Sequence, residues 1–217
     1  MIPELRGLPR GEVLFDMDGT LITNDVAEAC LRGLDRRGHR NAVTSGVSAV
    51  FEAYGAIADY AEQCRYAALA LGGLELGQVD ELVDEAFARG EVEPVAAVCE
   101  LAAHLALTHR TWLLTASPEV LGVAVGKRLG FTRVHGIKLR RRGNTLLPET
   151  IGRIPCGLGK VQAAWEMTGR VPLFAIGDSP HDLPLLRHAR VARTCGKGAG
   201  VEFPAWPTLA APGGRSG

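Results

Sequence analysis

Two aspartates, Asp16 and Asp18, follow the short apolar segment 13–15, which has the sequence Val-Leu-Phe. Side chains alternate along an extended chain with a period of two, so the two carboxylates point the same way. In such a pair, one carboxylate can act as a nucleophile and the other as a general acid. Gly19 comes next and permits a sharp turn. The alternative is a helix cap or Asx turn that closes the strand, because Asp and Gly are common there.

A second acidic group follows the apolar segment 173–177 and has the sequence Asp178-Ser179-Pro180-His181-Asp182. Mg²⁺ prefers hard oxygen ligands and keeps several waters, so it needs only a few carboxylates. Asp16 and Asp178 could supply two of them. The alternative is a helix N-cap at Ser179 or Asp182, which does not readily explain Asp178.

Two further segments could bind phosphate. Thr115-Ala116-Ser117-Pro118 joins a predicted strand to a predicted helix, where hydroxyls and free N–H groups suit a phosphate. The alternative is a plain cap by Ser117 with Pro118 in the first turn, and both can hold at once. Lys160 lies at another predicted helix start, where a cation is slightly unfavourable. Neutralising a phosphate or a carboxylate would explain its position; otherwise it is a solvated lysine.

Strands and helices alternate along most of the chain. Apolar runs predict strands at 12–15, 111–115, 134–139, 145–147, 173–177 and 191–192. Helices are predicted at 95–107, 118–130, 159–167 and 182–187. This order indicates an α/β fold with a doubly wound parallel sheet, in which ligands bind beyond the carboxyl ends of the strands. Asp16, Thr115 and Asp178 all lie at such ends, so we expect them to meet in space.

The segment between about 25 and 89 differs from the rest, because Ala, Leu, Glu and Arg dominate it and strand-like alternation is absent. We predict three or four helices there and no sheet, forming a separate helical module. The expected organisation is a core domain made of 1–23 and 92–206, an inserted helical cap at 24–91, and a disordered tail at 207–217 that is rich in Pro, Gly and Ala.

The bulk composition is that of an ordinary globular protein. The chain has 217 residues, and its 24 basic and 24 acidic side chains balance to zero net charge. This balance argues against a nucleic-acid or membrane-surface partner, and no apolar run is long enough to span a membrane. The five cysteines form no CxxC pair, and residues 1–10 do not resemble a signal peptide, so we expect a cytoplasmic protein with free thiols. The sequence gives no oligomeric state.

In chain order, the Asp16-Met17-Asp18-Gly19-Thr20 segment, the strand end at Thr115, Lys160 and the 177–182 segment resemble the four motifs of the haloacid dehalogenase (HAD) superfamily. The resemblance runs from Val13 to about Cys195 and implies a Rossmann-like core. The helical insertion looks like that superfamily's C1 cap. The stretch 60–65 (Tyr-Ala-Glu-Gln-Cys-Arg), followed by 69–74, resembles the cap of the phosphoserine phosphatase-like branch.

The resemblance implies a role for each motif residue. Asp16 would attack phosphorus, and Asp18 would protonate the leaving alkoxide and then activate water. Lys160 would offset the negative charge. Phosphoryl oxygens would bind at Thr115, Ala116 and Ser117. Mg²⁺ would be held by Asp16, the Asp18 carbonyl and Asp178, with Asp182 close by.

The acid at position 18 favours a phosphatase over a dehalogenase within this superfamily, because an alkoxide leaving group needs a proton and a halide does not. The resemblance therefore implies a Mg²⁺-dependent phosphomonoesterase acting on a small phosphorylated metabolite, possibly one like phosphoserine. A phosphotransferase with the same intermediate is one alternative. A non-catalytic module that binds a phospho-ligand is another, although such a module would normally have lost a motif residue and none is missing here.

Three residues bear on the substrate. Asp25 lies where phosphoserine phosphatases carry a Glu that faces an amine, and Arg65 lies where they carry an Arg that grips a carboxylate. The alternatives are a helix cap for Asp25 and a solvated helix face for Arg65. His181 replaces the Asn common in those enzymes. The shorter Asp25 and the changed His181 place phosphoserine itself in question.

Overall fold

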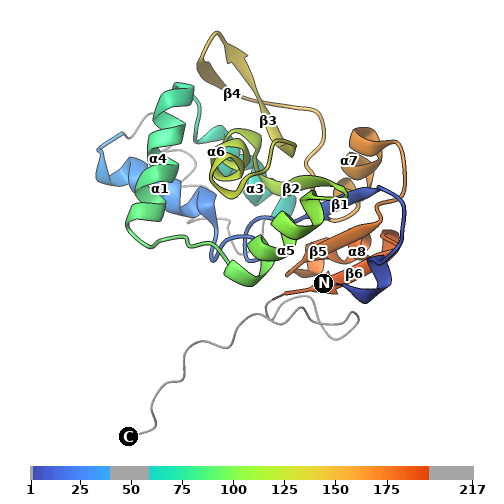
Figure 1. The fold of residues 1–217 in the computed structure, drawn as a ribbon. Helices are drawn as coiled ribbons and strands as arrows, with labels where there is room; N and C mark the ends of the chain where they lie inside the picture. The colour runs from blue at the N-terminus through green and yellow to red at the C-terminus, as the bar shows by residue number, and fades with distance from the viewer. Residues whose placement is uncertain (1, 40–58, 196–217) are drawn as a thin grey trace, which may run out of the picture.

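The computed structural model describes residues 2–39 and 59–195, and its centre is a six-stranded sheet (Figure 1). The strand order is β4-β3-β2-β1-β5-β6, and all neighbours are parallel except the β3–β4 hairpin. The strands are β1 (Glu12–Phe15), β2 (Arg110–Pro118), β3 (Val134–Arg142), β4 (Thr145–Ile151), β5 (Phe174–Gly177) and β6 (Val191–Thr194). The predicted α/β class is confirmed.

Helices connect the strands. Those described are α1 (Val26–Arg36), α3 (Tyr60–Leu69), α4 (Leu76–Ala88), α5 (Ala96–Ala106), α6 (Glu119–Leu129), α7 (Leu158–Thr168) and α8 (Leu183–His188). Short 3₁₀ turns lie at η1 (Pro3–Leu5) and η2 (Pro180–Asp182). No helix in the described ranges is both long and apolar enough to cross a membrane. All five cysteines are free thiols.

The central strands β1 and β5 are buried on both faces, which is why they are apolar without alternation. Val13 and Phe15 pack into the larger core with α5 and α6, whereas Leu14, between them, packs against α7 and α8. A period of two thus divides β1 between two apolar layers. Helices on both faces fix the strand ends that carry the acidic residues.

Four strands are longer than predicted, namely β2, β3, β4 and β6. The charged residues 140–142 extend β3 because they pair with β4 at the exposed edge of the sheet, where polar side chains cost nothing. One cap prediction was wrong. Helix α6 begins at Glu119 after Pro118, and Ser117 does not cap it. The Ser117 hydroxyl is instead directed to Asp18.

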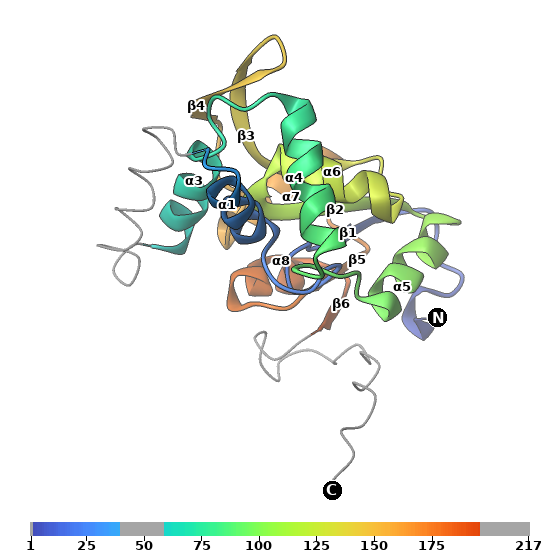
Figure 2. The same cartoon turned by 90° about the vertical axis from the view of Figure 1, so that its left-hand side faces the viewer.

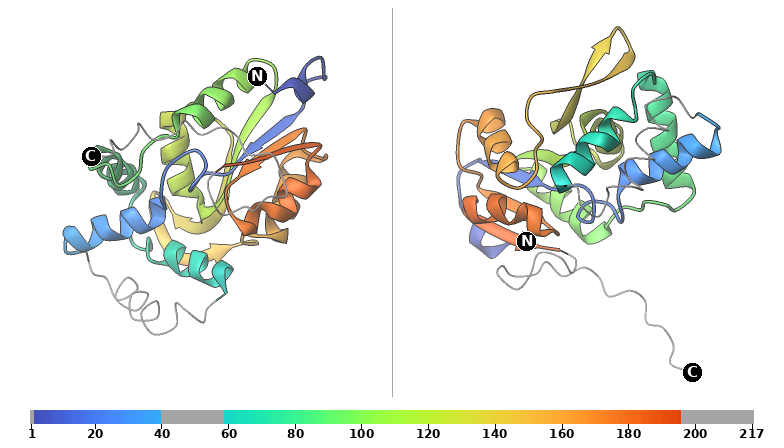
Figure 3. Two further views of the ribbon diagram at one scale, coloured as in Figure 1. Left: turned by 90° about the horizontal axis from the view of Figure 1, so that it is seen from below. Right: turned by 180° about the vertical axis from the view of Figure 1, so that it is seen from behind.

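The described part of the 24–91 segment contains three helices, α1, α3 and α4 (Figure 2). Backbone hydrogen bonds tie the turn before α4 to the hairpin, from Gly73 to Leu146 and from Leu146 to Leu74. Figure 3 shows α1 and α3 at the end of the sheet where the parallel strands finish. The division into core and cap stays a prediction, and the predicted tail at 207–217 lies outside the described residues.

Candidate active site

The acidic residues gather where β1 ends, at the middle of the sheet. From β1 the chain builds β2 and β3 on one side and later β5 and β6 on the other. Such a switch point leaves a crevice at the carboxyl ends of the strands. Asp16 follows β1 and Asp178 follows β5, and Thr115 lies on β2, so all three meet as predicted.

A cavity of about 80 Å³ lies at this point. It is lined by Asp16, Asp18, Tyr60, Thr115, Ala116, Lys160, Asp178, Ser179 and His181. Seven of these nine residues were singled out from the sequence, and they come from four separate motifs. Tyr60 and Ser179 were named in the sequence analysis but were not predicted to be site residues.

Lys160 is buried and bridges two of the carboxylates at this site. It is the third residue of α7 and is 3% exposed. Its Nζ donates to Asp16 Oδ1 at 2.5 Å and also to Asp182 Oδ1. Burial by itself lowers the pKa of Lys160, but the two carboxylates outweigh burial and raise that pKa above its ordinary value. The ammonium therefore stays charged beside Asp16, which accounts for a lysine at a helix start.

Asp182 holds the neighbouring turn together. Its Oδ2 accepts hydrogen bonds from the Ser179 backbone N–H at 3.0 Å and from the Ser179 hydroxyl at 2.7 Å. This is a capping box, so the alternative interpretation of these residues also holds. Burial would raise the pKa of Asp182, but Lys160 lowers it below its usual value. Asp182 thus fixes Lys160 and the turn that carries Asp178.

The site fits a hard divalent cation. Carboxylate oxygens of Asp16, Asp178 and Asp182 lie within 4.8 Å of one another. One lysine faces these three buried or partly buried carboxylates, which leaves an excess of negative charge. Burial and the charge of Asp182 raise the pKa of Asp178 to about 6. Oxygen ligands with uncompensated negative charge are those that suit Mg²⁺.

Gly19 makes room for this cluster. Its φ is +76°, and a Cβ placed on it would lie 2.2 Å from Asp178 Oδ2. Only glycine satisfies both conditions at this turn.

Asp18 is held separately from the cluster. Its Oδ1 accepts from the Val26 backbone N–H at 2.9 Å, and its Oδ2 accepts from Ser117 Oγ at 2.7 Å and Thr115 Oγ1 at 3.2 Å. Burial, followed by the charge of Asp25, raises the pKa of Asp18 to about 7. A carboxyl with a pKa near neutrality is suited to both giving and taking a proton. Its backbone carbonyl stays a predicted metal ligand.

A family comparison matches the part of the chain that carries these residues. The haloacid dehalogenase-like hydrolase family matches residues 13–187. This chain is a haloacid dehalogenase-like hydrolase. No curated protein matches the sequence.

Solved structures share the fold of this HAD-like hydrolase. A HAD family hydrolase from Salmonella enterica serovar Typhi superposes with a TM-score of 0.67 at 18% identity, over 88% of this chain and 64% of that one. This chain therefore spans less than two thirds of that protein. A phosphoserine phosphatase, solved as a phospho-aspartyl intermediate analogue, superposes with a TM-score of 0.57 at 17% identity, over 87% of both chains. A protein of unknown function from Bordetella pertussis superposes with a TM-score of 0.69 at 16% identity, over 87% of this chain and 91% of that one.

Two predicted substrate residues of the HAD-like hydrolase are outside the lining of the cavity. Asp25 caps α1 by accepting from the Glu28 backbone N–H at 2.9 Å. Arg65 pairs with Glu62 one turn earlier on α3, and its side chain is 43% exposed. Both therefore have the structural roles that were the alternatives. Asp25 still raises the pKa of Asp18 through its charge.

The third predicted substrate residue, His181, does line the cavity and stacks on Tyr60. The two ring centroids are 4.0 Å apart, and the planes differ by 7°. Tyr60 begins the stretch that resembles a cap, but no spacing rule links it to His181, 121 positions later in the chain. Sequence analysis had no signal for this contact.

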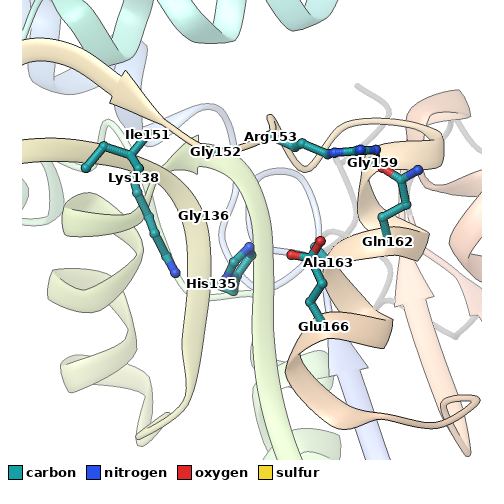
Figure 4. Close-up of a pocket in the computed structure, with 10 residues that line it drawn as sticks. All are labelled: His135, Gly136, Lys138, Ile151, Gly152, Arg153, Gly159, Gln162, Ala163 and Glu166. Carbon is teal, nitrogen blue, oxygen red and sulfur yellow. Dashed lines mark hydrogen bonds between the residues drawn. The ribbon is translucent and has the colours of Figure 1, made fainter.

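A second hollow of about 80 Å³ lies between β3 and α7 (Figure 4). Its polar groups are of both signs and include His135, Lys138, Arg153 and Glu166. Arg153 already donates to the Gln162 side chain at 2.6 Å. No paired nucleophile and acid occur among its described lining residues, so the candidate active site remains at β1.

Proposed function

We propose that this HAD-like hydrolase is a Mg²⁺-dependent phosphomonoesterase that acts on a small phosphorylated metabolite through an aspartyl-phosphate. The observation that carries the proposal is the bridge from Lys160 to Asp16 and Asp182, in one cavity with Asp18. It combines a nucleophile, a fixed positive charge and a separate carboxyl with a pKa of about 7.

In the first step an Asp16 oxygen attacks phosphorus, and the ester P–O bond breaks. The departing alkoxide takes the proton of Asp18, which needs its protonated form at that moment. Lys160 holds Asp16 in place and offsets the charge that gathers around it. Thr115 and the backbone near Ala116 would bind the phosphoryl oxygens, as predicted for the end of β2.

In the second step Asp18, now ionised, takes a proton from water. The water oxygen bonds to phosphorus, and the bond between phosphorus and Asp16 breaks, which releases phosphate and restores both carboxyl groups. Asp16 and Asp178, supported by Asp182, would hold Mg²⁺ together with the Asp18 carbonyl. The bound ion would stabilise negative charge on the phosphoryl oxygens.

The helical segment 24–91 would act as a cap over this site. Its α3 places Tyr60 in the lining of the cavity, and Val26, the first residue of α1, donates its N–H to Asp18. Both contacts support a segment that shapes the site from outside the core. The likeness to a phosphoserine phosphatase supports the phosphatase class without naming the substrate.

Replacing the nucleophile tests the proposal. Asp16→Asn should lower phosphate release by several powers of ten, because an amide is a poor nucleophile. Chelation of Mg²⁺ should abolish activity in the wild type. Asp80→Asn, which removes a surface partner of Lys127, is the matched control and should leave activity unchanged. Activity of Asp16→Asn within about tenfold of wild type would contradict the mechanism.

A further inference from the structure

Two aromatic rings lie side by side in the wall of the candidate site. Tyr60 is the first residue of α3, and His181 lies in η2 just before α8. Their rings stack in parallel at 4.0 Å, and both line the cavity that holds Asp16. Each ring is half-buried, so each keeps surface available for another molecule.

The cavity inside this pair is small. Its volume is about 80 Å³. The cavity is lined by Asp16 together with both rings, so an ester whose phosphorus lies at Asp16 brings its alcohol toward the rings. Tyr60 and His181 are therefore the aromatic part of the wall that the alcohol meets.

The charged side chains that line the cavity limit which charged groups the alcohol can carry. Among the described residues that line the cavity, Lys160 is the one lysine or arginine, and Asp16 and Asp182 already engage it. The phosphate brings its own negative charge to this site. A further carboxylate on the alcohol would find no free cation among the described lining residues, since Arg65 is not one of them and is paired with Glu62.

We propose that the Tyr60–His181 pair is the subsite for the leaving group, and that it favours phosphate esters of uncharged alcohols with a flat, apolar face over esters that carry a carboxylate. The proposal rests on the proposed function and narrows its substrate class. An aromatic or similarly flat group gains stacking and apolar contact with the exposed parts of the two rings.

Three esters test the preference in the full chain with Mg²⁺. 2-Phenylethyl phosphate and butyl phosphate have alcohols of similar acidity, so their leaving groups differ mainly in the flat ring. O-Phosphoserine adds an amine and a carboxylate. We expect kcat/KM for the phenylethyl ester to exceed that of butyl phosphate by about two- to tenfold, the worth of one aromatic contact. Phosphoserine should be the poorest of the three.

Two variants of Tyr60 test whether the stacked Tyr60–His181 rings cause the preference for the phenylethyl ester. Tyr60→Phe keeps the ring and should keep the ratio of phenylethyl to butyl ester. Tyr60→Ala removes the ring and should bring the ratio to about one. The ratio is unaffected by a general loss of activity or of folded protein, because both esters report on the same sample. Equilibrium binding of 2-phenylethylphosphonate and butylphosphonate, which are not hydrolysed, should give the same order without turnover.

An unchanged ratio in Tyr60→Ala would overturn the subsite. So would a preference for phosphoserine that Arg65→Ala removes, since that result assigns the carboxylate to Arg65. Hydrolysis of p-nitrophenyl phosphate separates this failure from a failure of the proposed function. If the wild type releases phosphate from that activated ester yet shows no preference among the three, only the subsite is wrong. If it hydrolyses no ester, both proposals are wrong.

Discussion

At the scale of single residues, Asp18 is held by three donors from two separate places in the chain. The Val26 N–H comes from the start of α1, and the hydroxyls of Thr115 and Ser117 come from β2. These hydrogen bonds favour the ionised form and partly offset the burial that raises the pKa of Asp18 to about 7. Both protonation states are therefore accessible near neutral pH, as a residue that gives and takes a proton requires.

Removing that acid should matter most for poor leaving groups. Asp18→Asn keeps the size of the side chain but cannot donate a proton to an alkoxide. We expect its first step to slow by roughly a hundredfold or more with an alkyl phosphate and by much less with p-nitrophenyl phosphate. Rapid mixing measures that step directly. Equal losses with the two esters would contradict the general-acid role.

Gly19 should be required for the metal site as well as for the turn. In Gly19→Ala the new Cβ would displace Asp178 Oδ2, so we expect Mg²⁺ affinity measured by calorimetry to fall at least about tenfold. Gly38→Ala is the matched control, because Gly38 also has a positive φ, +67°, but has no atom within 4 Å of the added carbon. The control should lose about 1–2 kcal/mol of stability and no metal affinity. Wild-type affinity in Gly19→Ala would place the cation elsewhere.

At the scale of elements, the ends of β1, β2 and β5 account for what the sequence could predict. Each is an apolar run followed by polar residues, and neighbouring parallel strands bring those ends together whatever their separation in the chain. Asp16, Thr115 and Asp178 were therefore predictable. The contact of Ser117 with Asp18 was not, because it depends on β2 continuing past Thr115. The contact of Tyr60 with His181 was not either, because it depends on how α3 is placed against the turn before α8. Neither contact leaves a periodicity in the sequence.

The β1–β2 pairing also contains a buried charge whose effect depends on pH. Glu12 is 3% exposed and accepts from Arg110 Nε at 2.6 Å and Trp112 Nε1 at 2.7 Å. Burial raises the pKa of Glu12, but these hydrogen bonds outweigh it and hold that pKa below its ordinary value. The ionised carboxylate therefore stabilises the fold above its unfolded pKa, and this stabilisation is lost as pH falls through the lower folded pKa.

Glu12→Gln should thus destabilise the protein by about 1–3 kcal/mol at pH 7, and the difference from wild type should shrink on acidification. Denaturant unfolding of wild type and variant at pH 7 and at acidic pH measures this difference. Glu149→Gln, which removes the exposed partner of Arg140, should stay within about 1 kcal/mol of wild type throughout. If the difference in unfolding free energy between wild type and Glu12→Gln grew as pH fell, the pKa of Glu12 would not be lowered in the folded protein, and the account would be contradicted.

At the scale of the whole molecule, a doubly wound core supplies the charged groups, and the helical segment supplies Tyr60 and the N–H of Val26. The predicted order of strands and helices followed from their alternation along the chain. The way α1, α3 and α4 pack on the core could not be predicted, because their apolar faces fix no partner by themselves. Ion pairs such as Lys127 with Asp80 then join α6 to α4.

The central claim is that Asp16 carries the phosphoryl group during turnover. A reaction with one equivalent of a small phosphate ester labelled in its phosphoryl group, stopped by acid within a single turnover, tests it most directly. Peptide mapping by mass spectrometry should find the phosphoryl group on Asp16, and the adduct should be absent from Asp16→Asn and cleaved by hydroxylamine. Phosphate release by the wild type with no adduct at any time, or with the label on another residue, would contradict the account.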